Sequence, residues 1–353
     1  MNRFCLAAFL IGVLSAAPAS AWDRGDVDVL AVLPDVTPGV PSSVEGLTVG
    51  PDDNIYVTSF GFNAKGAIAS GNSVLFVIKP NGNLVRKVPI ANSSPHTLGL
   101  AFNPVNGYLL VLDFGAGKVL HVNPVTGAST DFTPVVPGSG LNALTFDKYG
   151  NVYISDSFNG VIWKTGPGGG SPTAWNSDPL LQPGTGLTPP FGANGVEFNN
   201  AGTILFVANT ATHQIIQIPV NPNGTAGTAS IFITGINAPD GIAIDRKDNL
   251  WVCANQEDDI IVLDKTGKVI AKLGDFNGID DSGIVRGLLF PASPAFSKDG
   301  KTLYVSNLTL FLPYAGAQAA VDSPWTLKVK QYTVAKMRAV IPPPGDGDHG
   351  KDH

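Results

Sequence analysis

The chain has 353 residues, with 22 Lys and Arg against 28 Asp and Glu, and a formal net charge of −6. This mildly acidic chain offers no basic cluster that could follow a phosphate backbone, which argues against a nucleic-acid partner. Its length allows a large buried core, and none of its apolar runs is long enough for a predicted membrane span.

The first 21 residues, MNRFCLAAFLIGVLSAAPASA, are typical of a secretory signal peptide. Arg3 precedes an apolar run from Phe4 to Leu14, and small residues stand before a cleavage point after Ala21. We therefore expect residues 1–21 to be removed and the mature protein to be secreted or periplasmic. Cys5 leaves with the signal, so Cys253 remains alone and no intrachain disulfide is expected.

A repeated pattern organises the rest of the chain. Each copy has a small or polar start, a short alternating strand, an Asp/Asn/Gly turn and a second β-rich strand, which is a hairpin signature. The copies, 44 to 53 residues apart, are EGLTVGPDDNIYVTS, LGLAFNPVNGYLLVLD, NALTFDKYGNVYISD, NGVEFNNAGTILFVAN, DGIAIDRKDNLWVCAN and SPAFSKDGKTLYVSN. This spacing predicts an all-β fold, a six-bladed β-propeller of four-stranded antiparallel blades over residues 22–340.

The ends of the chain complete this prediction. The segment DVDVLAVLPDV, before the first copy, is a spare strand that we expect to complete the last blade and close the ring. The tail over residues 341–353 is rich in Pro, Gly and Asp and is predicted to be disordered. Its two histidines are interpreted as part of a solvated tail, with metal binding as the less favoured reading.

Alignment of the six copies places one residue of each blade at the same point of its first strand. These residues are Glu45, Leu98, Asn142, Asn194, Asp240 and Ser293. First strands line a propeller's channel, so Glu45, Asn142, Asn194 and Asp240 would form a ring of side-chain oxygens with two negative charges. Hard divalent cations, calcium above all, prefer such ligands. Any one of the four alone would be read as a turn residue.

The acidic residues of the hairpin turns are interpreted differently. Each lies between the two strands of a repeat, where Asp and Asn are common turn formers. They are Asp52, Asp53, Asp147, Asp245, Asp248 and Asp299.

The phrases VEGLTVGPDDNIYVTS, NGVEFNNAGTILFVAN and PDGIAIDRKDNLWVCA resemble the senescence-marker-protein/gluconolactonase family of six-bladed propellers. That family includes regucalcin-type lactonases and is related to diisopropyl fluorophosphatase and the paraoxonases. The resemblance covers about residues 40–310. It implies a channel-bound Ca²⁺, or another divalent ion such as Zn²⁺, Mn²⁺ or Mg²⁺, on Glu45, Asn142, Asn194 and Asp240. We find no counterpart of the arginine that binds sugar-acid carboxylates in regucalcin-like members.

The chemistry implied is hydrolysis of a lactone or related ester. A divalent ion can polarise a carbonyl or phosphoryl oxygen, while Asp240, which matches the family's catalytic aspartate, acts as base or nucleophile. His96, in SSPHTLGLAF, is a candidate for proton transfer because a similar Pro-His pair occurs in paraoxonases. A surface-loop role for His96 is an equal alternative.

Two hypotheses remain open at this stage. The first is a secreted calcium-dependent hydrolase with a small-molecule lactone or ester as its partner. The apolar residues Phe60, Phe62, Pro189, Pro190 and Phe191 suggest an apolar or aromatic leaving group, and capping of the channel is an equal alternative for them. The second is a non-enzymatic, calcium-stabilised propeller that binds a protein or glycan. A strictosidine-synthase-like condensation and a quinone-dependent dehydrogenase fit the ring less well. The sequence leaves the oligomeric state open.

Overall fold

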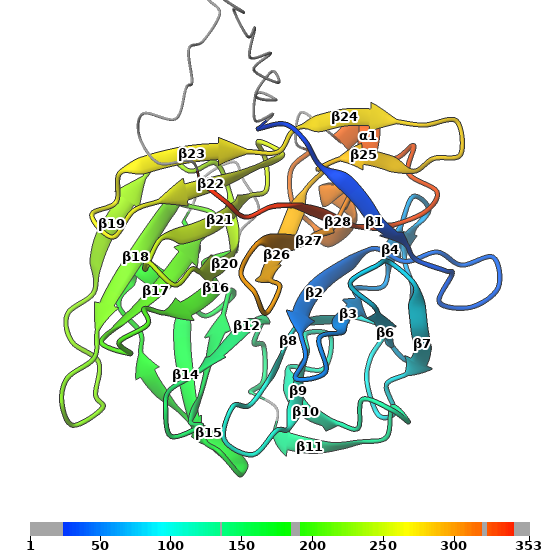
Figure 1. The fold of residues 1–353 in the computed structure, drawn as a ribbon. Helices are drawn as coiled ribbons and strands as arrows, with labels where there is room; N and C mark the ends of the chain where they lie inside the picture. Colours follow the sequence, from blue (N-terminus) through cyan, green and yellow to red (C-terminus); the bar gives the residue numbers. More distant parts are fainter. Residues whose placement is uncertain (1–23, 135, 185–190, 320–322, 342–353) are drawn as a thin grey trace, which may run out of the picture.

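The computed structural model describes residues 24–134, 136–184, 191–319 and 323–341. Within them, six four-stranded antiparallel sheets are arranged around a central channel (Figure 1). The prediction of a six-bladed propeller with four-stranded blades is therefore confirmed. The predicted signal peptide and, apart from Ile341, the predicted tail lie outside the described residues.

Five blades are built from strands that follow one another from the channel outward. Blades one and two contain β2 (Val44–Val49), β3 (Ile55–Ser59), β6 (Val74–Ile78) and β7 (Leu84–Pro89), then β8 (Thr97–Phe102), β9 (Leu109–Asp113), β10 (Lys118–Val122) and β11 (Ser129–Thr133). Blade three contains β12 (Leu141–Phe146), β13 (Val152–Asp156), β14 (Val161–Gly166) and β15 (Gly169–Asn176). Blade four contains β16 (Ala193–Phe198), β17 (Ile204–Asn209), β18 (Gln214–Pro219) and β19 (Ser230–Thr234). Blade five contains β20 (Pro239–Ile244), β21 (Leu250–Ala254), β22 (Asp259–Leu263) and β23 (Val269–Leu273).

Blade six joins the two ends of the chain. It contains β26 (Pro291–Phe296), β27 (Thr302–Asn307) and β28 (Thr333–Arg338), and β1 (Asp28–Val32) pairs antiparallel with β28 as the outermost strand. The N-terminal segment thus closes the ring as predicted. It also covers the strand edge that β28 would otherwise expose.

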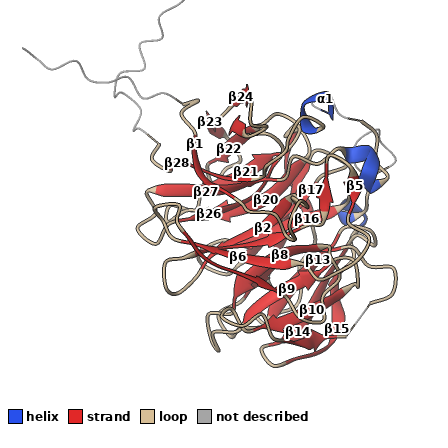
Figure 2. Cartoon of the chain, turned by 90° about the vertical axis from the view of Figure 1, so that its right-hand side faces the viewer, coloured by secondary structure: helices blue, strands red, loops and turns tan. Residues whose placement is uncertain are grey.

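The remaining elements are short. They are the hairpins β4 (Phe62–Asn63) with β5 (Gly66–Ala67) and β24 (Phe276–Ile279) with β25 (Val285–Gly287), the 3₁₀ turns η1 (Pro179–Leu181) and η2 (Leu312–Ala315), and the helical turn α1 (Ser323–Thr326). Figure 2 shows the helical turns gathered on one face of the propeller. No helix within the described ranges is long and apolar enough to cross a membrane.

The core consists of apolar layers between neighbouring blades, and the second strands show why. In β9, Leu109 and Val111 pack in the layer shared with blade one, whereas Leu110 and Leu112 pack in the layer shared with blade three. Successive side chains of a strand point to opposite faces, so a strand that is covered on both faces is apolar at every position. The continuous LLVL run follows from this burial.

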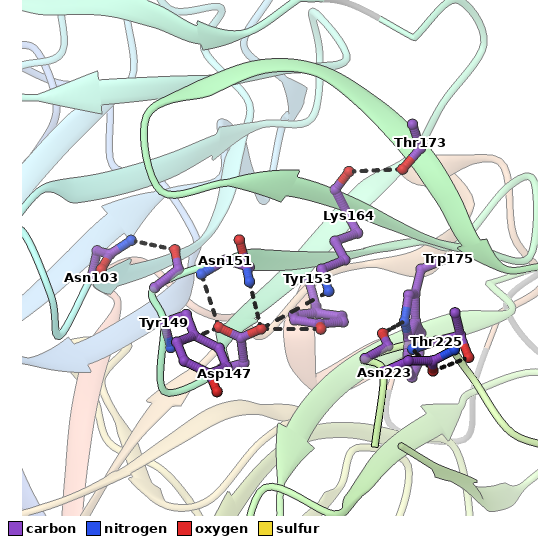
Figure 3. Close-up of polar contacts among 12 residues, drawn as sticks. Asn103, Asp147, Tyr149, Asn151, Tyr153, Lys164, Thr173, Trp175, Asn223 and Thr225 are labelled. Carbon is purple, nitrogen blue, oxygen red and sulfur yellow. Dashed lines mark hydrogen bonds and ion pairs between the residues drawn. The ribbon is translucent and has the colours of Figure 1, made fainter. Parts of the chain in front are cut away.

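The predicted turn chemistry is confirmed by hydrogen bonds. Asp147 accepts the backbone N–H groups of Tyr149 and Asn151 at 2.9 and 3.0 Å, and the Asn151 amide and Tyr153 hydroxyl also donate to it (Figure 3). Asp52 and Asp245 make the same kinds of contact in blades one and five. These carboxylates hold their hairpins and lie apart from the ring residues.

Candidate functional site: an oxygen-lined cavity in the channel

All six inner strands carry a β-bulge at the same level. In β20, Pro239 pairs with Ala254 and Ile242 with Val252, so Asp240 and Gly241 together oppose one residue, Cys253. The same two-against-one register occurs in the other five blades. A bulge re-aims the side chains beside it. The first bulged residues, which form the ring, are Glu45, Leu98, Asn142, Asn194, Asp240 and Ala292.

The prediction that Ser293 is the blade-six member of this ring is wrong. Pro291 pairs with Asn307 and Pro294 with Val305, which makes Ala292 the first bulged residue and Ser293 the second. Four other blades have Gly at the second position, and the Ser in blade six shifted the alignment by one residue. The ring therefore has four oxygen-bearing members and two apolar members, Leu98 and Ala292.

The glycines of the repeat allow the inner strands to converge at this level. A Cβ on Gly195 would lie 2.2 Å from the carbonyl oxygen of Asp240, and one on Gly46 would lie 2.0 Å from that of Leu98. No side chain fits at such distances. In the four blades that have glycine after the ring residue, this glycine is thus needed for the close approach of the next blade's ring residue.

The structure brings the four predicted ligands together. Glu45, Asn142, Asn194 and Asp240 are 5–6% exposed and line one cavity of about 40 Å³. The other residues that line it are Phe60, Leu98, Phe191, Thr210, Asn255, Leu308, Leu310 and Leu312. Sequence reasoning missed Thr210 and Asn255. Both directly follow a second strand, Asn255 as the last residue of its repeated phrase and Thr210 one residue after its phrase, and this common position was the available signal.

The Asn194 amide is held so that its oxygen has no protein partner. Its Nδ2 donates to Thr210 Oγ1 at 2.9 Å, and Thr210 in turn donates to the carbonyl of Pro239 at 2.8 Å. Asn194 Oδ1 is buried and accepts no hydrogen bond from the described residues. A buried polar atom without a partner is costly, so this oxygen points to a ligand in the cavity.

The two carboxylates of the ring, Glu45 and Asp240, are buried, and burial destabilises their charged forms. Burial, with the charge of Asp240 as a second cause, raises the pKa of Glu45 well above its ordinary value. Burial likewise raises the pKa of Asp240 to about 7, although the amides of Asn255 and Asn194 oppose the shift. Asn255 Nδ2 donates to Asp240 Oδ2 at 3.0 Å and fixes that oxygen. A cation between the carboxylates would offset both penalties.

The donor set fits a hard divalent cation. Two carboxylates balance a double positive charge, and the amide groups of Asn142 and Asn194 add neutral oxygens. Among the described residues there is no group of three or more His, Cys, Asp or Glu that could hold a metal. No His or Cys is among the described residues that line the cavity, so the nitrogen and sulfur ligands typical of zinc sites are lacking there. The free Oδ1 of Asn194 is the structural observation that supports this fit.

His96 lies behind the cavity wall. Its Nδ1 is 2.7 Å from the carbonyl oxygen of Phe60, and its ring packs against Phe62 with centroids 5.0 Å apart. A carbonyl can only accept, so Nδ1 carries the proton and Nε2 of the neutral ring is the nitrogen able to take one. Phe60 lines the cavity and His96 does not. The structure therefore separates His96 from the four ring residues.

These features define a class of protein, a six-bladed propeller with an oxygen-lined cavity at one level of its channel. The chain matches the model of the SMP-30/gluconolactonase/LRE-like region over residues 91–274, just over half of its length, and it belongs to this family. The resemblance predicted from the repeats is thereby confirmed.

Curated relatives are similar over part of the chain. Lactonase drp35 of Staphylococcus haemolyticus is 29% identical over 142 residues, and that of Staphylococcus aureus strain USA300 is 27% identical over the same length. Each alignment covers 38% of this chain and 41% of the relative. The matched stretch thus spans about two fifths of the relatives' length.

Solved structures share the fold over most of the chain. A gluconolactonase from Xanthomonas campestris has a TM-score of 0.59 at 13% identity, covering 84% of this chain and 86% of its own. A calcium-binding protein, regucalcin, from Agrobacterium tumefaciens has a TM-score of 0.59 at 16% identity, covering 88% and 94%. At these identities the likeness shows the fold, which agrees with the six blades described above.

Proposed function

We propose that this protein is a secreted or periplasmic, divalent-cation-dependent hydrolase of lactones or related esters. The ring residues Glu45, Asn142, Asn194 and Asp240 hold the cation, with Ca²⁺ as the favoured ion. The observation that carries this proposal is the buried, unpartnered Oδ1 of Asn194 beside two buried carboxylates in one cavity. Family membership supports the reaction class, because its curated relatives are lactonases. The structurally similar regucalcin, a calcium-binding protein, supports the choice of ion.

The bound cation would supply polarisation of the substrate carbonyl and stabilisation of the charge that develops on its oxygen. The chain's own residues position the reacting groups. Asn255 holds one oxygen of Asp240 at 3.0 Å and leaves the other to act on water as a base or on the carbonyl as a nucleophile. Thr210 fixes the amide plane of Asn194 and so aims its oxygen into the cavity.

His96 has a supporting part in this proposal. Its proton at Nδ1 is fixed by the carbonyl of Phe60, so its other nitrogen can accept a proton during turnover. Since Phe60 separates it from the cavity, transfer from the reaction centre to His96 would pass through a bridging water.

Hydrolysis of a panel of lactones and aryl esters, with excess Ca²⁺ and with chelator, tests the proposal. We expect turnover of at least one class with Ca²⁺ and its loss with chelator. Lack of turnover on every member at saturating Ca²⁺ would overturn the hydrolase assignment. Turnover that is unchanged by exhaustive chelation would overturn the role given to the ring.

One observation favours a second function, a calcium-stabilised propeller that binds a protein or glycan. The cavity of about 40 Å³ has room for little more than an ion and its water, and apolar side chains surround the rest of it. In a purely structural site the cation would raise thermal stability without any turnover. The same panel, combined with melting curves, separates the two functions.

A further inference from the structure

Apolar side chains from several blades line most of the cavity outside the ring. Phe60 and Leu98 belong to blades one and two, Phe191 precedes the inner strand of blade four, and Leu308, Leu310 and Leu312 follow the second strand of blade six. Thr210 and Asn255, from blades four and five, are the polar residues of the wall outside the ring. Outside the ring, the described wall of the cavity is therefore mostly apolar.

Two of these apolar residues, Phe60 and Phe191, belong to a series of aromatic rings that reaches the surface. The ring centroids of Phe60 and Phe114 are 5.7 Å apart, those of Phe114 and Phe158 are 5.3 Å apart, and Phe158 stacks on Phe191 at 5.7 Å. Phe60 is 4% exposed and Phe158 is 44% exposed. The four residues come from loops of four successive blades, and we call them the aromatic wall.

Charge and hydrogen bonding around the cavity disfavour a polar substrate. Of the described residues that line it, Glu45 and Asp240 are the charged ones, and no Lys, Arg or His is among them. Thr210 already donates to the carbonyl of Pro239, and the Asn255 amide donates to Asp240 and to the carbonyl of Pro291. An anionic group on the substrate would lose water there without a cationic side chain to bind it, and hydroxyls that extend over the apolar wall would lose water without gaining partners.

We propose that this site takes lactones and esters that carry an uncharged aryl or alkyl group and discriminates against polyhydroxylated and anionic lactones. The inference rests on the proposed hydrolase function and names its substrate class. The small cavity accepts the reacting carbonyl, and the apolar group lies outside it against Phe158 and Phe191. The reaction is ordinary hydrolysis, in which the acyl C–O bond breaks, water adds, and a hydroxy acid or an acid and alcohol form.

The test uses six-membered lactones: three that differ in the length of a single alkyl substituent, and one that carries several hydroxyl groups. With Ca²⁺ saturating, kcat/KM is measured for δ-valerolactone, δ-octalactone, δ-decalactone and D-glucono-1,5-lactone. We expect kcat/KM to rise by about two- to fourfold per added methylene, the upper figure corresponding to full burial. D-glucono-1,5-lactone should fall about 100-fold below δ-decalactone. If kcat/KM did not change with alkyl chain length, or were equal for D-glucono-1,5-lactone and δ-decalactone, the proposed substrate class alone would be overturned. Lack of turnover on every lactone would overturn the hydrolase function as well.

A matched pair of variants locates the selectivity. Phe158→Ser removes the exposed end of the aromatic wall, and Tyr149→Ser removes an aromatic ring that is 66% exposed in the hairpin turn of the same blade. Phe158→Ser should lower kcat/KM for δ-decalactone about tenfold, the equivalent of losing one to two buried methylenes. It should leave δ-valerolactone within about twofold of wild type, and Tyr149→Ser should change neither substrate.

Phe158→Leu is the control for loss of stability. It keeps an apolar side chain over Gly140, against which the Phe158 ring packs. It should retain more than half of the chain-length dependence. Equal losses on both lactones in the Phe158→Ser variant, with an unchanged melting temperature, would show that the wall does not bind the substituent and would overturn the proposal.

Discussion

Asp240→Asn removes one of the two buried carboxylates of the ring while it keeps the size of the side chain. In the metal-free protein the ionised Asp240 destabilises the folded state, because burial raises its pKa to about 7 from an ordinary value of 3.8. Because the pKa of this carboxyl is raised on folding, the metal-free protein has its full unfolding free energy below pH 3.8 and loses part of it as pH rises through 7. The variant should therefore be more stable than wild type in chelator at pH 8.

The size of the effect follows from linkage. The rise of the Asp240 pKa from 3.8 to about 7 lowers the unfolding free energy by about 4 kcal/mol at pH 8. About 3 kcal/mol of this loss occurs between pH 5 and pH 8. Ca²⁺ at 100 to 1,000 times its Kd should restore about 3 to 4 kcal/mol to the wild type. It should add almost nothing to Asp240→Asn, since the ring then lacks one of its two charged ligands.

Urea unfolding followed by tryptophan fluorescence, with EGTA or with Ca²⁺ at pH 5 and pH 8, measures these differences. Glu197→Gln is the matched control. Burial also raises the pKa of Glu197 to about 7, but this residue accepts a hydrogen bond from Thr145 and lines the wider cavity further along the channel. Glu197→Gln should stabilise the metal-free protein and keep the full Ca²⁺ response. An Asp240→Asn protein that keeps this response, or is less stable than wild type in EGTA, would refute the reasoning.

Three further predictions concern the ring and its surroundings. Glu45→Gln should weaken Ca²⁺ binding by about 10- to 100-fold and lower the melting temperature in Ca²⁺; an unchanged chelator response of melting would contradict the shared site. Gly195→Ala should cost about 1–3 kcal/mol of stability because its Cβ meets the Asp240 carbonyl, whereas Gly166→Ala, with open space around its Cβ, should be nearly neutral. His96→Gln keeps a donor for the Phe60 carbonyl but accepts no proton, so kcat should fall about 100-fold at constant melting temperature. An unchanged kcat would remove His96 from the chemistry.

The repeat allowed the fold and four ring residues to be predicted, because both depend on local patterns. A hairpin that recurs every 44 to 53 residues specifies a blade, and a polar residue before Gly recurs at the same point of several copies. The N-terminal strand could be assigned for a similar reason, since a β-run without a partner must pair somewhere.

The parts that the sequence did not reveal depend on register and on contacts between blades. Amino-acid composition does not reveal the bulge that orients each ring residue. In blade six, where Ser293 replaces Gly, the predicted alignment was therefore shifted by one residue. Phe114 and Asn255 are distant from the ring in sequence, and only the closed propeller brings Phe114 to Phe60 and Asn255 to Asp240. Such pairings are tertiary, so no single repeat carries them.

Calorimetric titration of Ca²⁺ into chelator-treated protein at pH 8 tests the central claim most directly. One divalent ion per chain should bind at the ring, with binding lost in Asp240→Asn and retained in Glu197→Gln. Failure of the wild type to bind any divalent ion, or equal binding in Asp240→Asn, would contradict the assignment of the ring as a cation site.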